Sequence, residues 1–283
     1  MNILYLVGVL LAAFFTMFGI VATIGGEVGF QITMGNLLNF ADFSSVLITV
    51  FGTLSVVIAC YPKLAKSFPK HMGILLRARA FEPDTYVEQL VELAQIARKN
   101  GLLALEEKGN EQENAFFKQA IMLVVDNNDP EQVRSILENE IEQTSSRHQE
   151  VVAMYERGSN AAPAFGMIGT LIGLINMLRS LDGADMNSLG PNMSVALVTT
   201  FYGSLMAHVV FNPIAANLTA RDEEEVLCRQ IIMEGIMAIQ AGENPKFLRE
   251  RLLTFMNESK RDGASGAGSG EADGKRRRRG RKK

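Results

Sequence analysis

Two uncharged segments of the chain place threonine, glycine and proline at helical spacing. Residues 163–173 read PAFGMIGTLIG and residues 193–218 read MSVALVTTFYGSLMAHVVFNPIAANL, with no Asp, Glu, Lys or Arg in either. A plain membrane anchor needs only large apolar residues, whereas small residues and hydroxyls let helices pack closely and line a polar path. We therefore expect an ion pathway or a closely packed transmembrane partner at these segments.

The small and polar residues of the first segment are spaced by three, four and three, and they are Pro163, Gly166, Thr170 and Gly173. This spacing places them on one face of a helix. In the second segment Thr199 begins a series of small residues, and Thr200 lies beside it. A threonine hydroxyl can ligate a small cation together with a carbonyl that a nearby proline frees. The alternative is that the hydroxyls bond back to their own helices and serve packing only.

The titratable groups near these segments are few. Neither segment contains an acidic residue, although a proton relay within a membrane usually needs an Asp, Glu or His. A carboxylate on an ion path must therefore come from another subunit. His208 is the only candidate relay in the segments, and a lone histidine is more typical of packing. Asp42, before another apolar stretch, either attracts cations to an entrance or caps a helix.

Two prolines lie within the apolar segments, Pro163 and Pro213. A proline inside a helix removes a backbone donor, kinks the helix and frees a carbonyl. The two prolines are either a conformational relay between membrane and cytoplasm or ordinary prolines of membrane helices.

The elements that must position these residues follow from composition and hydropathy. The chain has 283 residues, of which 47% are hydrophobic, and a mean hydropathy of +0.10. These values are typical of a membrane protein with a large soluble part. No strand pattern stands out, so we predict an all-α fold with four transmembrane helices and a helical cytoplasmic domain. The four expected spans are residues 3–24, 41–61, 160–178 and 191–218.

The distribution of basic residues predicts the orientation. Lys63, Lys66 and Lys70 directly follow the second span, whereas the short loops 25–40 and 179–190 hold one basic residue, Arg179. Cytoplasmic loops carry the excess of Lys and Arg. We therefore place residues 62–157 and both termini in the cytoplasm.

The chain is thus predicted to divide into five parts. The apolar residues of 131–156 recur at helical spacing and are expected to continue into the third span as one long helix. The tail holds ten Lys or Arg against three acids and begins with a Gly/Ser-rich linker, so it either binds anionic lipid or is simply disordered. The parts are spans one and two (1–61), a cytoplasmic helical loop (62–157), spans three and four (158–220), C-terminal cytoplasmic helices (221–258) and a disordered polybasic tail (259–283).

A charged segment in the cytoplasmic loop is a candidate contact surface. The sequence RKNGLLALEE places Arg98 and Lys99 before an apolar stretch and Glu106 and Glu107 after it. Such charges are usually a solvated face, but they can also steer a partner of complementary charge.

Several classes of function are not expected. Cys60 and Cys228 are not expected to form a disulfide framework, and the three histidines are scattered, so no metal site or bound cofactor is predicted. The chain before the tail is acidic, which argues against nucleic-acid binding. No nucleophile–base pair or phosphate-binding loop is present, so an enzyme is the least expected class.

Four stretches, ARKNGLLALEE, APAFGMIGTLIGLINML, LGPNMSVALVTTFYG and VFNPIAANL, resemble the MotA/PomA family of flagellar stator proteins within the MotA/TolQ/ExbB superfamily. The resemblance covers nearly all of residues 1–258. It implies a multi-pass protein of the bacterial inner membrane and a ring of five such chains around two MotB/PomB-type chains. The partner supplies the ion-binding Asp, inward flow of Na⁺ or H⁺ turns the ring, and the cytoplasmic loop pushes the rotor protein FliG.

The resemblance also assigns roles to residues of this chain. Arg98 and Glu106 match the charged rotor-contact positions, with Lys99 and Glu107 beside them. Pro163 and Pro213 match the two functional prolines of the family, and the resemblance implies that they relay conformational change between the membrane and the cytoplasm. A further acidic position of some sodium-type members falls on Gly109 here.

Three polar residues match positions of the ion pathway in the same family. Thr170 and Thr200 match hydroxyls associated with sodium use, with Thr199 beside them, and Asp42 matches an acidic position near the periplasmic ion entrance. Some proton-driven members have alanine at the position of Thr170, so its presence favours sodium.

Two rival interpretations remain at this stage. An energiser of outer-membrane processes like ExbB or TolQ uses similar ion-motor logic, but such chains have three spans and an N-terminus outside. A non-conducting membrane scaffold would tolerate the loss of Thr170, Thr200 and both prolines.

Overall fold

The computed structural model describes residues 3–24, 30–32, 39–76, 82–182 and 186–256. The chain forms two compact units. Unit 1 combines residues 1–79 with 146–221, and unit 2 combines 80–145 with 222–283. Each unit therefore contains parts of the chain that are distant in sequence.

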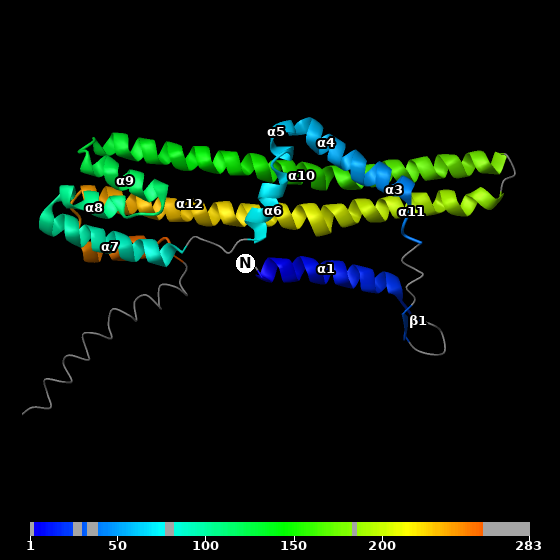
Figure 1. Ribbon diagram of the computed structural model, residues 1–283, viewed down its shortest axis with the longest axis horizontal. Coiled ribbons are helices and arrows are strands. Elements are labelled where there is room, and N and C mark those ends of the chain that lie inside the picture. Colours follow the sequence, from blue (N-terminus) through cyan, green and yellow to red (C-terminus); the bar gives the residue numbers. More distant parts are fainter. Residues whose placement is uncertain (1–2, 25–29, 33–38, 77–81, 183–185, 257–283) are drawn as a thin grey trace, which may run out of the picture. The chain divides into compact units, whose positions relative to one another are not determined.

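The predicted all-α fold is confirmed, because nearly all described elements are helices (Figure 1). The helices of the first half of the chain are α1 (Ile3–Val21), α3 (Phe43–Val46), π-helical η1 (Leu47–Phe51), α4 (Gly52–Cys60), α5 (Pro62–Ala65), α6 (Phe68–Leu76), α7 (Pro83–Asn100), η2 (Leu102–Ala104), α8 (Leu105–Asn110) and α9 (Ala115–Val125). Those of the second half are α10 (Pro130–Asp182), η3 (Met186–Ser188), α11 (Leu189–Leu205), π-helical η4 (Met206–Phe211), α12 (Asn212–Gln240) and α13 (Pro245–Leu253).

One short pair of strands departs from the sequence prediction. Strand β1 (Ala22–Ile24) pairs antiparallel with β2 (Phe30–Ile32), with Thr23 opposite Gln31. Helix α1 therefore ends at Val21 and not at residue 24. Thr and Ile are β-branched and favour extended backbone, and two glycines follow them in the sequence. The expected loop over 25–40 lies mostly outside the described residues.

Three described helices are long and apolar enough to cross a membrane. They are Phe43–Cys60, the apolar part of Pro130–Leu181 and the apolar part of Leu189–Gln240. The described apolar part of α1, Tyr5–Ile20, is shorter than these three. Helix α10 runs without interruption through the predicted third span, as the sequence pattern indicated (Figure 1).

Glycines bring α10 and α11 close together in unit 1. A Cβ atom on Gly203 would lie 2.6 Å from the carbonyl oxygen of Ala162, and one on Gly169 would lie 2.4 Å from the Thr199 side chain. Real Cβ atoms do not approach other atoms so closely, so these positions need glycine for the observed contact. The small residues predicted from spacing therefore lie in a tight helix–helix contact.

Many large apolar side chains remain exposed on unit 1 of the single chain. Examples are Phe15 on α1, Phe43 on α3, Leu171 on α10 and Leu197 on α11, which are 65%, 78%, 59% and 62% exposed respectively. Exposed apolar surface of this extent marks contact with lipid or with other protein chains. Unit 1 also exposes polar side chains, for example Asn212, which directly follows η4.

Unit 2 has an aliphatic and aromatic core shared by α7, α9, α10, α12 and α13. Leu90, Phe117, Ile231 and Leu248 are completely buried in it. Helix α7 ends at Asn100, and the next residue, Gly101, has a positive φ of 85° that suits glycine and turns the chain into η2. Asn114 caps α9 by accepting hydrogen bonds from the backbone N–H groups of Phe116 and Phe117.

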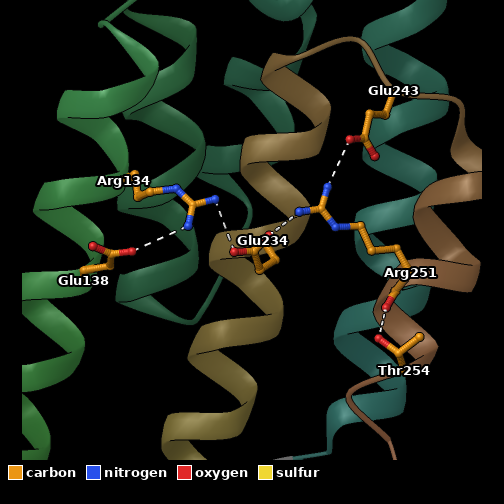
Figure 2. Close-up of polar contacts among 6 residues, drawn as sticks. All are labelled: Arg134, Glu138, Glu234, Glu243, Arg251 and Thr254. Carbon is orange, nitrogen blue, oxygen red and sulfur yellow. Dashed lines mark hydrogen bonds and ion pairs between the residues drawn. The ribbon is translucent and has the colours of Figure 1, made fainter.

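Ion pairs connect three helices of unit 2 (Figure 2). Glu234 on α12 contacts Arg134 of α10 at 3.2 Å and Arg251 of α13 at 2.6 Å. Arg251 also pairs with Glu243 at 3.0 Å, and Arg134 with Glu138 at 3.5 Å. The Glu234 side chain is 14% exposed, so this carboxylate depends on its two arginines for stabilisation.

Candidate ion pathway and rotor-contact surface

Thr170 on α10 and Thr200 on α11 point toward each other in unit 1. Their hydroxyl oxygens lie 2.7 Å apart. The Thr170 hydroxyl also lies 3.1 Å from the Gly166 carbonyl and 3.2 Å from the Ala196 carbonyl, which the Thr200 hydroxyl approaches at 3.3 Å. The sequence placed both threonines on small-residue faces, and the structure brings them together.

The threonine pair concentrates oxygen atoms at one point of a helix contact that otherwise has few polar groups. The two hydroxyls lie within hydrogen-bond distance of each other and of the Ala196 carbonyl, and Thr170 also of the Gly166 carbonyl, but each hydroxyl has only one proton to donate. Thr200 is exposed on the single chain and Thr170 is half-buried. The pair therefore has unused oxygen lone pairs at an accessible surface, which suits water or a small hard cation.

Thr199 does not join this pair. Its side chain is fully buried, and its hydroxyl lies 2.8 Å from the Val195 carbonyl and 3.1 Å from that of Ala196. Thr49 of η1 donates toward the Thr199 carbonyl at 3.4 Å. The geometry at Thr199 is that of helix packing with a back-bonded hydroxyl, the alternative that the sequence left open.

Asp42 caps the helix that follows it. Its carboxylate accepts a hydrogen bond from the Ser45 backbone N–H at 2.6 Å and another from the Ser45 hydroxyl at 2.5 Å. The side chain is half-buried. Capping satisfies an orphan N–H group of the first turn, which is the local reason for an acid at this position.

Pro163 lies at the glycine contact between α10 and α11, whereas Pro213 lies at the start of α12. Pro163 lies inside the continuous helix α10 opposite Gly203, where a Cβ atom would lie 3.2 Å from the Pro163 Cα. Pro213 follows the π-helical segment η4, and such segments occur where the regular hydrogen-bond ladder is broken. Ser159 of α10 donates to the side-chain oxygen of Asn212, beside Pro213, at 2.6 Å.

The predicted rotor-contact charges all lie exposed in unit 2. Arg98 and Lys99 lie in the last turn of α7, and Glu106 and Glu107 lie in the first turn of α8. None of the four forms an ion pair with another described residue. The two glutamates line a groove of about 580 Å³ beside Leu103, which is 73% exposed.

Gly109 has a structural role in α8. It is buried, and a Cβ atom there would lie 2.8 Å from the Ile121 side chain. A larger residue at this position would require the Ile121 side chain to move.

Sequence reasoning missed a buried polar pair in unit 1. His71 of α6 lies 3.3 Å from the Tyr155 hydroxyl of α10, and both side chains are buried. Burial raises the pKa of Tyr155 to about 12 and lowers the pKa of His71, because the charged forms are poorly solvated there. The neutral tyrosine hydroxyl is therefore available to donate to the imidazole.

Comparisons with known proteins agree with this architecture. The model of the MotA/TolQ/ExbB proton channel family matches residues 108–258. The chain belongs to this family. Motility protein A of Borreliella burgdorferi is 39% identical over 233 residues, which are 82% of this chain and 89% of that protein. Chemotaxis protein PomA of Vibrio alginolyticus is 38% identical over 248 residues, 87% of this chain and 96% of that protein.

Solved structures show the same fold. The structure of C. jejuni MotAB matches with a TM-score of 0.79 and 28% identity over 91% of this chain and 97% of that chain. The flagellar MotAB stator complex of Bacillus subtilis matches with a TM-score of 0.73 and 30% identity over 80% and 89% of the two chains. The resemblance to MotA/PomA proteins is thereby confirmed. These relatives are motility proteins and not enzymes, as the sequence indicated.

Proposed function

We propose that this chain is a stator subunit of the bacterial flagellar motor, which couples inward ion flow to torque on the rotor protein FliG. The proposal is supported by the similarity of this chain to motility proteins over more than four-fifths of its length. The similarity to the C. jejuni MotAB structure covers 91% of the chain. The observation that carries the ion-coupling part is the Thr170–Thr200 hydroxyl pair, which is exposed on an apolar helix contact.

A partner chain completes this pathway. The third and fourth spans contain no acidic residue, although Asp and Glu within a membrane typically mark the path of an ion. We propose a MotB/PomB-type partner that supplies the acid, with two such chains inside a ring of five copies of this one. The transported Na⁺ or H⁺ is cargo, and no cofactor is proposed.

The proposed topology has four spans in the bacterial inner membrane, with α1 as the first. Both termini and residues 62–157 face the cytoplasm, in accord with the positive-inside rule. Residues 221–258 add C-terminal cytoplasmic helices. The polybasic tail of 259–283 lies outside the described residues and stays a prediction.

Sodium is the proposed ion. Thr170 contributes to a cluster of hydroxyl and carbonyl oxygens, and a bare alkali cation needs such ligands, whereas proton transfer does not. Asp42 is proposed to favour cations at the periplasmic entrance in addition to its capping role. Thr199 supports the pair through packing, and Pro163 and Pro213 couple ion passage to helix movement.

The test replaces Thr200 by valine in the full chain, expressed with its genomic partner in a host that lacks stators. Valine keeps the volume but removes the hydroxyl, so ion flow and swimming speed should fall while the complex still assembles in the membrane. Thr219→Val is the matched control, because the Thr219 hydroxyl only bonds back to Ala215 at 3.1 Å. Full motility of Thr200→Val would remove the hydroxyl pair from the proposed pathway.

A further inference from the structure

One face of the helix formed by α11, η4 and the start of α12 changes from apolar to polar along its length. The first two exposed residues on this face are Met193 and Leu197, which are 53% and 62% exposed. At spacings of three and four, the face continues with four exposed polar residues, and these are Thr200, Ser204, His208 and Asn212.

Such a face is not suited to lipid. Polar side chains in an apolar span are costly against hydrocarbon, and they are retained where they meet water, an ion or another polar surface. His208 is the only Asp, Glu, Lys, Arg or His residue within 189–220. The His208 side chain is exposed on the single chain.

Hydrogen bonds fix the side chains at the C-terminal end of this face, at His208 and Asn212. Asn212 accepts from the Ser159 hydroxyl through Oδ1 at 2.6 Å, and its Nδ2 lies 3.3 Å from Nδ1 of His208. An amide NH₂ group only donates, so Nδ1 of His208 must accept and the proton of the neutral ring is on Nε2. Asn212 thus orients the imidazole, and the Nε2–H group remains to hydrogen-bond water.

We infer that Ser204, His208 and Asn212 line the cytoplasmic half of the ion path and carry a hydrated monovalent cation from the Thr170–Thr200 pair toward the cytoplasm. The inference rests on the proposed function, and the opposite wall of the path belongs to the MotB/PomB-type partner. The hydroxyl, the imidazole N–H and the amide each bind water, so the cation regains hydration after the threonine pair. Asn212 is a positioning residue for His208.

The test measures which positions of the face are reached by water. Single cysteines replace Thr200, Ser204, His208, Asn212 or Val210 in a Cys60→Ser, Cys228→Ala background. The full chain is expressed with its partner in membrane vesicles and exposed to a charged methanethiosulfonate from the cytoplasmic side. Val210 is the matched control, because it is 40% exposed but faces an apolar groove lined by α1.

Cysteines at 204, 208 and 212 should react at least about tenfold faster than the one at 210, since the reactive thiolate forms only where water solvates it. Labelling should also block ion flow. As a second measurement, His208→Leu should reduce ion flow several-fold, and His208→Gln, which can still bind water, should recover most of it.

Two results separate the inference from the function on which it rests. If the cysteine at 200 reacts quickly but those at 204, 208 and 212 react no faster than the one at 210, the inference is wrong and the threonine pathway stands. If the cysteine at 200 is also unreactive in an assembled complex, the proposed pathway itself fails. Equal ion flow in His208→Leu and the parent chain would likewise overturn the role of His208.

Discussion

Thr170 and Thr200 differ from Thr16 and Thr219 because their hydroxyls contact each other across two helices. Thr16 on α1 and Thr219 on α12 bond back only to the carbonyl four residues earlier, at 2.7 Å and 3.1 Å. Back-bonding satisfies a hydroxyl in apolar surroundings without giving it any other role. The contact across helices, at 2.7 Å, is therefore the residue-scale observation that points to function.

His71 gives a pH-dependent expectation at the same scale. Burial lowers its pKa, so the folded chain binds this proton less tightly than the unfolded chain does. The stabilising contribution of neutral His71 is complete when the pH is above the ordinary histidine pKa of about 6.5, and it is lost as the pH falls below that value. The unfolding temperature of the detergent-solubilised full chain should thus fall more on acidification than that of His71→Gln.

The Gln variant is the control, because it keeps a hydrogen-bonding partner for Tyr155 but has no titratable ring. Parallel pH profiles for the two proteins would show that His71 is not held in its neutral form by burial.

The sequence predicted the candidate pathway only in part, because it does not show which direction each side chain points around the helix axis. Thr199 and Thr200 are adjacent and equally suited to ion binding by type, but neighbouring residues of a helix point about 100° apart. The structure buries Thr199 and exposes Thr200. Ser204, His208 and Asn212 do show the period of four in the sequence, and that signal becomes informative only when the exposed face is known.

At the scale of elements, Glu234 links α10, α12 and α13 through its two arginines. Glu234→Gln leaves both arginines without this charge at a site where the carboxylate is 14% exposed. We expect a loss of about 1–2 kcal/mol of unfolding free energy, at the lower end of a buried pair because the arginines are partly solvated. Thermal unfolding of the full chain measures it.

The matched control is Glu111→Gln, which breaks an exposed pair with Lys108 whose side chains are 43% and 57% exposed. Such pairs contribute about 0–1 kcal/mol, so this variant should stay near the parent chain. A loss for Glu111→Gln as large as for Glu234→Gln would contradict the linking role of Glu234.

A second prediction at the scale of elements concerns the charged end of α7 and the charged start of α8. Arg98→Glu and Glu106→Lys reverse exposed charges that have no ion pair among the described residues. Each should lower motor torque, measured on tethered cells, while the chain stays in the membrane at normal amounts, because the fold does not depend on these charges. Glu113→Lys, an exposed acid outside the RKNGLLALEE segment, is the control. Unchanged torque in both variants would exclude this segment as the rotor contact.

Prediction of the elements succeeded where hydropathy and helical period agree. The long helix α10 was predicted because its polar and apolar parts have the same period, and the structure shows it continuous. The strands β1 and β2 were missed, since three residues are too few for an alternating pattern to be recognised. The π-helical η4 before Pro213 also has no signature in the sequence, because it depends on how the neighbouring helices satisfy the backbone.

At the scale of the whole molecule, the chain combines two kinds of surface in two units. Unit 1 exposes apolar side chains that need lipid or other chains to cover them, whereas unit 2 has its own buried core and exposed charges. The proposed stator function, in which a channel component also pushes a soluble rotor, needs both kinds of surface. Under that proposal a single chain is incomplete as a path for ions, so each functional measurement includes the proposed partner.

The most direct test of the central claim is swimming speed in a stator-deleted host that carries this chain and its genomic partner. Sodium is varied while the proton motive force is held constant. A sodium-driven stator gives a speed that rises with sodium, and Thr170→Ala should weaken that rise. Swimming that is restored but indifferent to sodium would contradict sodium coupling, and no swimming from an assembled complex would contradict the stator function itself.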